Sequence, residues 1–333
     1  MMQAMQKFMQ IASLTAVALV GITSAIPALP QLSPQALRAY EAGQQVRRSL
    51  LESRQNPQTG LPDGLTDVDI LEFALTLENL EATFYQQGFA RFPDSDFAAL
   101  GLNQADILNL KSISTIEATH VTTLSAAIAG TGAAPVQPCI YDFKFSDAAS
   151  MVSTASILES VGVSAYLAAA PLVKSPAILT VAAEIVTVEA RHQTFIRTAS
   201  KAVAIPGPFD TPLGIRGVFS IAATFIKSCP PGSSLAITPF PPLTMSPSQA
   251  PGKMVGGTEV RMDSSAAANA VSCAFVNGGQ PGGAAFAPFQ NGACVLPMGL
   301  NGITYVHLAN SIPKDGVLSD AIVLAGPLVV VID

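Results

Sequence analysis

The sequence is poor in charged residues and contains no tryptophan. Asp, Glu, Lys and Arg make up 12% of its 333 residues, whereas hydrophobic residues make up 49%. Soluble domains have about 25% charged residues and disordered chains have few hydrophobic ones, so this composition excludes a disordered chain. The net charge is −6. Because Lys and Arg form no cluster that would neutralise phosphates, nucleic acid is excluded as a partner.

Long apolar runs are also missing. After the N-terminus, no segment of about 20 residues is apolar without a polar helix face or a break, so no membrane span is predicted. The apolar stretch at residues 11–20 follows Lys7 and precedes a small-residue cleavage site at 23–25. This pattern predicts a secretory signal peptide over residues 1–25, with an ordinary N-terminal helix as the alternative. We therefore expect a secreted, extracellular protein.

Cysteines are few and none lies in a Cys-x-x-Cys spacing, so neither a zinc site nor a redox pair is indicated. No Asn-x-Ser/Thr acceptor for N-glycosylation is present. Four cysteines in an oxidising compartment predict two disulfides. Cys139 and Cys229 flank the helical half, while Cys273 and Cys294 lie in the C-terminal half. Pairing within each half is the simplest of the three connectivities that four cysteines allow.

The chain divides into an N-terminal arm at 26–64, with one short helix near 35–52, a helical region at 65–230 and a C-terminal region at 233–333. Helix-capping residues and a 3–4 spacing of apolar residues predict four long helices and a shorter fifth one. The link between the second and third helices has roughly 15 residues and can cross the whole bundle, whereas the third and fourth helices are joined by a short link. This plan is a four-helix bundle with one long crossover. The predicted helices cover residues 66–87, 103–129, 146–170, 175–205 and 211–227.

Residues 233–333 are dense in Gly and Pro and contain short β-rich runs. Turn sequences of the Asn-Gly and Asp-Gly type separate these runs, which predicts a β-sandwich-like domain of about a hundred residues. It contains no catalytic motif, and we expect His307 to be packed or exposed rather than a ligand. The predicted strands cover residues 258–262, 270–276, 293–297, 304–308 and 321–332.

Histidine is scarce, and its positions are informative. Two of the three histidines stand in Glu-x-x-His, as Glu117/His120 and Glu189/His192, each within a predicted helix. Residues i and i+3 project from one helix face, so the carboxylate and the imidazole can reach the same point. A bundle that directs two such pairs inward needs one more carboxylate from each of the other two helices to complete a two-metal site.

Glu78 and Glu159 supply these carboxylates from the first and third helices. Each stands in an apolar run and has a tyrosine seven residues later, Tyr85 and Tyr166. The chain therefore reads Glu-x6-Tyr and then Glu-x-x-His, twice over. Buried carboxylates are costly unless a cation compensates them. Oxygen-rich ligation with one imidazole per ion favours two Fe or Mn ions over zinc or copper. The predicted metal ligands are Glu78, Glu117, His120, Glu159, Glu189 and His192.

Other residues near these motifs have open roles. Glu81 lies one turn after Glu78 and is interpreted as a substitute ligand or a residue that supports a ligand. Glu184 is interpreted as a surface residue, and Arg191 as a surface residue or, alternatively, as a partner that supports a ligand glutamate. Tyr85 and Tyr166 either are ordinary core residues or form hydrogen bonds with ligand carboxylates and relay electrons.

Three segments carry a resemblance to a known family: residues 71–85, 157–166 and 188–192. They resemble the ferritin-like domain of fungal stress-response and sexual-development proteins and of plant desiccation-related proteins. The resemblance covers roughly residues 65–230, and the β-rich tail is similar to the C-terminal part of the fungal members. It implies a di-iron site with the six ligands named above. It does not imply one activity, because such bundles host storage, oxidase, peroxidase and desaturase chemistry.

Three functions are therefore predicted as alternatives. The first is a di-metal oxidoreductase of oxidase, peroxidase or catalase-like type, acting on peroxide, dioxygen or ferrous iron. The second is a stress or cell-wall protein in which the metal site is structural. The third is an interaction protein in which the bundle is a scaffold and the β domain binds a partner or a cell-wall polymer. The sequence favours the first and makes no prediction of the oligomeric state.

Overall fold

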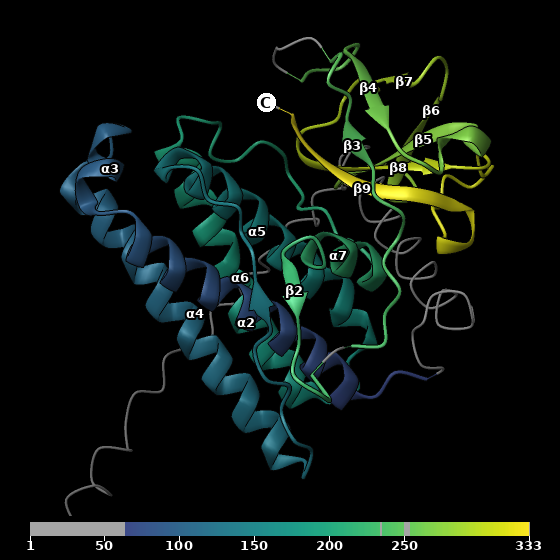
Figure 1. Ribbon diagram of the computed structural model, residues 1–333. Coiled ribbons are helices and arrows are strands. Elements are labelled where there is room, and N and C mark those ends of the chain that lie inside the picture. The colour runs from purple at the N-terminus through teal and green to yellow at the C-terminus, as the bar shows by residue number, and fades with distance from the viewer. Residues whose placement is uncertain (1–63, 234, 250–253, 333) are drawn as a thin grey trace, which may run out of the picture. The chain divides into compact units, whose positions relative to one another are not determined.

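The computed structural model describes residues 64–333 except 234, 250–253 and 333. The predicted signal peptide, the predicted arm and its helix near 35–52 lie outside the described residues. Figure 1 shows the helices and strands by label, and the described residues all belong to one compact unit of the chain.

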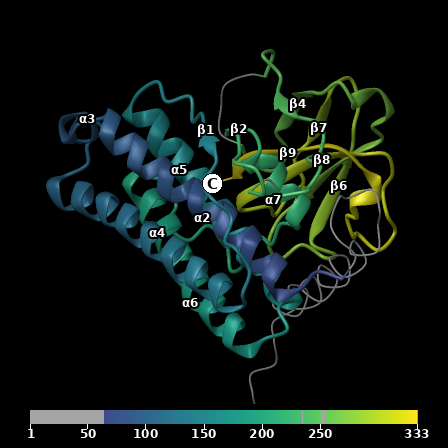
Figure 2. The same ribbon diagram turned by 60° about the horizontal axis from the view of Figure 1, so that its bottom comes forward.

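Four long helices form the bundle, and Figures 1 and 2 show them running alongside one another. The helices α2 and α4 pack together, as do α5 and α6. Two short helices, α3 (Asp94–Ala99) and α7 (Ile215–Ala222), accompany them, and a single 3-10 turn, Ala170–Leu172, follows α5. The long helices are α2 (Asp67–Arg91), α4 (Gln104–Gly130), α5 (Ala148–Ala169) and α6 (Pro176–Ala199).

Capping residues begin the helices close to the predicted positions. Thr66 and Asn103 each form a capping box with the acidic residue three positions later, which satisfies free N–H groups of the first turn. The α5 helix begins later than predicted, because Asp147 rather than Ser146 is its cap.

The prediction that α2 ends before Gly88 was wrong, since the helix continues to Arg91. At Gly88 a side-chain carbon would overlap Met151 of α5. This glycine therefore allows two helices to approach closely, and it does not end the helix.

The long crossover between α4 and α5 is held to the bundle by a strand and a disulfide. Strand β1 (Ile140–Tyr141) pairs with β2 (Ile226–Ser228) in an antiparallel sheet, and Cys139 forms a disulfide with Cys229. The ring of Phe143, also on the crossover, packs edge-on against Phe84 of α2 with 5.2 Å between centroids. The second disulfide joins Cys273 and Cys294, so both predicted pairings are confirmed.

One described helix is apolar enough to cross a membrane by length and composition. It is α5 with its 3-10 extension, Ala148–Leu172, and 72% of its most apolar window is buried inside the protein. The buried Glu159 stands in its middle. The apolar character of this helix therefore belongs to the core of the bundle.

The C-terminal region consists of two antiparallel sheets, ordered β3-β4-β7 and β6-β5-β8-β9. Hydrophobic residues from both sheets share one core, which includes Val260 of β4 and Val306 of β8. Every residue of β8 is buried, because β8 lies between β5 and β9 and its two faces pack in two hydrophobic clusters, one with Tyr305 and one with Val306. Strands β3 and β6 were not predicted, since β3 has only two residues and β6 contains no β-branched residue. The strands are β3 (Thr244–Met245), β4 (Glu259–Asp263), β5 (Ser272–Val276), β6 (Ala284–Pro288), β7 (Ala293–Val295), β8 (Gly302–Ala309) and β9 (Val323–Ile332).

Strand β8 also contributes to the core of the helices. Ile303 and Tyr305 pack within the hydrophobic cluster that fills the bundle. The Tyr305 hydroxyl lies 2.7 Å from the Ser164 hydroxyl and donates to the Ser160 carbonyl oxygen at 3.2 Å, both on α5. The described helices and strands are thus joined by buried polar contacts, while the domain boundary at 230–233 stays a prediction.

Candidate metal centre

The six predicted ligands come together in the middle of the bundle. Helix α2 supplies Glu78 and α5 supplies Glu159, while α4 and α6 each supply one Glu-x-x-His pair. All six side chains are buried, with no more than 7% of any residue exposed. The four helices therefore direct four carboxylates and two imidazoles to one place.

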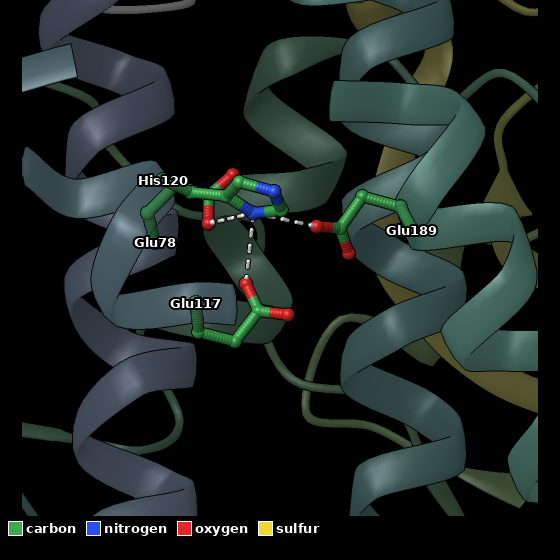
Figure 3. A group of neighbouring side chains, drawn as sticks. All are labelled: Glu78, Glu117, His120 and Glu189. Atoms are coloured by element: carbon green, nitrogen blue, oxygen red, sulfur yellow. Dashed lines mark hydrogen bonds and ion pairs between the residues drawn. The ribbon is translucent and has the colours of Figure 1, made fainter. Parts of the chain in front are cut away.

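His120 is the centre of one group of donor atoms, shown in Figure 3. Its Nδ1 atom lies 3.2 Å from Glu117 Oε2, 3.2 Å from Glu189 Oε1 and 3.3 Å from Glu78 Oε2. The carboxylates approach this nitrogen from three different helices (Figure 3).

His192 is the centre of the second group. Its Nδ1 atom lies 2.8 Å from Glu117 Oε1 and 3.2 Å from Glu159 Oε2. Glu117 and Glu189 belong to both groups, and within each group the donor atoms lie within 4.8 Å of one another. The arrangement thus has two shared carboxylates between two outer Glu–His sets.

The donor atoms fit divalent cations. Ligand atoms around a small octahedral cation lie about 3 Å apart, because the bonds are about 2.1 Å long and meet near right angles. The observed N···O separations of 2.8 to 3.3 Å are compatible with this value, and they are also the distances of hydrogen bonds between imidazole and carboxylate. Glu189 Oε2 is buried without a hydrogen-bond partner, while Glu189 Oε1, Glu78 Oε2 and Glu117 Oε1 are buried and each have an imidazole nitrogen within 3.3 Å. Unpartnered buried oxygens are rare in proteins, and two cations would satisfy these atoms and neutralise four carboxylates.

The carboxyl groups have strongly shifted pKa values. Burial raises the pKa of Glu78 to about 7 and, together with the charges of Glu117 and Glu159, raises the pKa of Glu189 well above its ordinary value. Burial also opposes ionisation of Glu117, but hydrogen bonds with His120 and His192 lower its pKa to about 2.

The imidazoles are shifted in the direction of their cationic forms. Burial disfavours protonated His120, yet hydrogen bonds with the surrounding carboxylates, Glu117 first, raise its pKa to about 12. The pKa of His192 rises to about 9 for the same reason. Without a metal, protonated imidazoles therefore act as the cations of this cluster.

The two tyrosines bind the outer carboxylates across the bundle. Tyr166 of α5 donates a hydrogen bond of 2.6 Å to Glu78 Oε1 on α2, and Tyr85 of α2 donates to Glu159 Oε1 on α5. Their hydrogen bonding to Glu78 and Glu159 is confirmed, while the role of these carboxylates as metal ligands stays a prediction. The Glu-x6-Tyr repeat thus forms a reciprocal pair, in which each tyrosine orients the glutamate of the other helix.

The residues with open roles are now placed. Glu184 and Arg191 are exposed, as expected. Glu81 is 4% exposed and belongs to neither donor group. Its pKa is raised well above the ordinary value by burial and then by the charge of Glu189. It is a fifth buried carboxyl group, beside the four of the cluster.

Gly162 of α5 provides the space for two of these carboxylates. A Cβ atom at this position would lie 3.0 Å from Glu189 Oε2 and 3.1 Å from Glu81 Oε1.

We expect Gly162→Ala to leave the helix intact, since alanine favours a helix by about 1 kcal/mol over glycine, but to weaken metal binding about tenfold by displacing Glu189. Isothermal titration with Mn²⁺ measures this effect. Gly130→Ala is the control, because its Cβ would meet no atom within 4 Å; equal affinities of both variants would contradict the prediction.

No sequence pattern indicates the contacts behind the predicted ligands on α5 and α6. Gln193, next to His192, donates to the Ser160 hydroxyl at 3.0 Å, and the Ser160 carbonyl accepts from Tyr305. A sequence pattern within one helix does not show which strand residue will contact it, so Tyr305 was missed.

The fold and the site together define a four-helix bundle with a buried carboxylate–histidine cluster that could hold metal ions. Residues 66–202 match the family model of the ferritin-like domain. This match extends from the cap of α2 past the end of α6 and includes all six clustered residues. The helical part of the chain is therefore a ferritin-like domain, followed by a β region. A search of curated proteins found no match.

Proposed function

We propose that this protein binds two Fe or Mn ions in the cluster and uses them as an oxidoreductase acting on peroxide, dioxygen or ferrous iron. The observation that carries the proposal is the pair of overlapping donor groups, each buried and each containing one imidazole. Glu78 and His120 would hold one ion, and Glu159 and His192 the other. Glu117 and Glu189 would be shared by both ions.

When bound, two adjacent redox-active ions supply electrons for chemistry on O–O bonds. The chain's own residues prepare the site for this. The hydroxyls of Tyr85 and Tyr166 fix the outer carboxylates. Burial of the cluster excludes bulk water and strengthens every electrostatic interaction within it.

We also propose that the protein is secreted. The two disulfides support an oxidising compartment, and the predicted signal peptide supports export. A role in stress or development, with association to a cell wall, extends the resemblance to the fungal and plant proteins and rests on it alone.

Peroxide consumption by the metal-loaded protein tests the reaction. We expect the Mn- or Fe-loaded protein to consume hydrogen peroxide at least about a hundredfold faster than His192→Ala treated in the same way, because that variant lacks an imidazole ligand. Glu184→Ala, an exposed residue on the same helix, should retain the activity. A protein that binds two ions but reacts with neither peroxide, dioxygen nor ferrous iron would assign the site a structural role.

A further inference from the structure

The bundle contains an apolar cavity of about 260 Å³ at one side of the metal centre. It lies between the beginnings of α2 and α6, the end of α5 and the second half of α4. None of its lining residues is charged, and Thr123 and Tyr166 supply the hydroxyls. The lining residues are Ile70, Leu71, Phe73, Ala74, Leu77, Thr123, Leu124, Ala127, Ala165, Tyr166, Ala169, Ala170, Val173, Ala177, Ile178, Val181 and Ala182.

The surroundings of the two equivalent tyrosines differ. Tyr85 is completely buried, with the ring of Phe84 at 5.1 Å and that of Phe89 at 6.0 Å between centroids. Phe97 packs in turn on Phe89 at 5.6 Å. Beside the corresponding tyrosine, Tyr166, seven of the residues that line the cavity are alanines. Large aromatic side chains thus fill the space beside Tyr85, whereas the alanines beside Tyr166 leave room for the cavity.

The inner end of the cavity reaches the metal centre. The ring of Tyr166 lines the cavity, while its hydroxyl donates to Glu78 Oε1 at 2.6 Å. Leu77 and Leu124 line the cavity as well. Leu77 directly precedes Glu78, and Leu124 follows His120 by one helical turn. A molecule in the cavity therefore lies against side chains that adjoin two metal-ligand residues.

The outer end is open to solvent between α4 and α6. Thr123 and Ala127 of α4 are exposed, and Val181 and Ala182 on α6 are half-buried. These two helices have far less contact with each other than either has with its packing partner. A small molecule can therefore enter from this side.

The lining defines the chemistry of the occupant. With no charged side chain present, a charged molecule would lose its hydration without compensation, so only an uncharged apolar molecule fits. An engineered apolar cavity of about 150 Å³ in another protein holds benzene. Benzene has six non-hydrogen atoms, so at the same volume per atom this cavity of about 260 Å³ holds roughly ten.

We propose that the cavity binds an uncharged, apolar organic molecule of about this size, placed against Tyr166 as the co-substrate of the metal centre. Its role as a co-substrate rests on the proposed oxidoreductase function. Binding itself depends only on the cavity and does not require the metal.

Naphthalene, with ten carbon atoms, is the probe. We expect the purified full chain to bind one naphthalene saturably, measured by its fluorescence. Ala182→Leu places three more carbon atoms at the cavity wall and should weaken binding at least about tenfold. Ala183→Leu is the matched control, since Ala183 is the adjacent exposed residue of α6 and does not line the cavity; it should bind as the wild type does.

Absence of saturable binding in the wild type would overturn the inference. This holds even if the cause is that another part of the chain or a second copy of the protein fills the cavity. Equal binding by the Ala182→Leu and Ala183→Leu variants would overturn it too. Metal content, measured on the same samples, separates the two proposals. Two ions without naphthalene binding refute the cavity site alone, whereas naphthalene binding without any metal refutes the oxidoreductase and with it the co-substrate role.

Discussion

Replacing Glu117 by alanine is expected to abolish binding of both metal ions, whereas replacing Glu78 should abolish binding of only one. Glu117 presents one oxygen to each histidine, with Oε1 at 2.8 Å from His192 and Oε2 at 3.2 Å from His120. Glu78 belongs to the His120 group alone. Metal analysis should therefore give close to zero ions per chain for Glu117→Ala and close to one ion per chain for Glu78→Ala.

Two controls keep this prediction testable. Glu184→Ala removes an exposed carboxylate from α6 and should leave two ions bound. Glu117→Gln keeps the shape of the side chain, so loss of metal in a variant with normal helical circular dichroism cannot come from misfolding. Equal metal content in the Glu117 and Glu78 variants would contradict the shared position of Glu117.

The metal-free protein is expected to lose stability as the pH rises from 6 to 9, and bound metal should remove this loss. Burial raises the pKa of Glu78 from 4.5 to about 7. The stabilising contribution of this carboxyl group is therefore complete below about pH 4.5 and disappears as the pH passes 7. Hydrogen bonds with carboxylates raise the pKa of His192 to about 9, so its stabilising contribution is complete below about pH 6.5 and disappears as the pH passes 9.

Glu117 behaves in the opposite way. Its pKa is lowered to about 2, so its contribution is present above about pH 4.5 and is lost only in acid. The optimum of the metal-free protein therefore lies near pH 4.5, because the contribution of Glu117 is lost below this pH and that of Glu78 is lost above it. Metal binding displaces protons from the carboxyl groups and imidazoles and thus strengthens with pH.

Thermal unfolding of chelator-treated and metal-loaded protein at pH 6 and pH 9 measures this difference. At pH 9 we expect the loaded protein to unfold at a temperature at least about 10 °C higher than the chelator-treated protein. Free metal at about a thousand times its dissociation constant contributes about 4 kcal/mol to the free energy of unfolding. The gap should be smaller at pH 6. A gap that is independent of pH would mean that metal binding is not coupled to these protons.

Much of the site was predictable because its information lies within single helices. The spacing of Glu117 and His120 fixes one face of α4, and the spacing of Glu189 and His192 does the same on α6. Tyrosines seven residues after Glu78 and Glu159 lie two turns further along the same faces. These local patterns indicated which side chains point inward, and the four-helix plan brought them together.

Features that depend on contacts between distant segments were not predictable. Gly88 looked like the end of a helix, yet it serves close packing against Met151. The contact of Tyr305 with α5 joins a strand to a helix about 140 positions earlier in the chain, which no periodic pattern encodes. The cavity beside Tyr166 arises from the sizes of side chains on four helices and likewise has no signature in any one of them.

Metal analysis of the purified wild-type protein, expressed with both Fe and Mn available, tests the central claim most directly. The claim predicts two transition-metal ions per chain, bound by the cluster of four buried carboxylates and two histidines. A correctly folded protein that contains no transition metal, and takes up none when titrated with Fe²⁺ or Mn²⁺ at neutral pH, would contradict it.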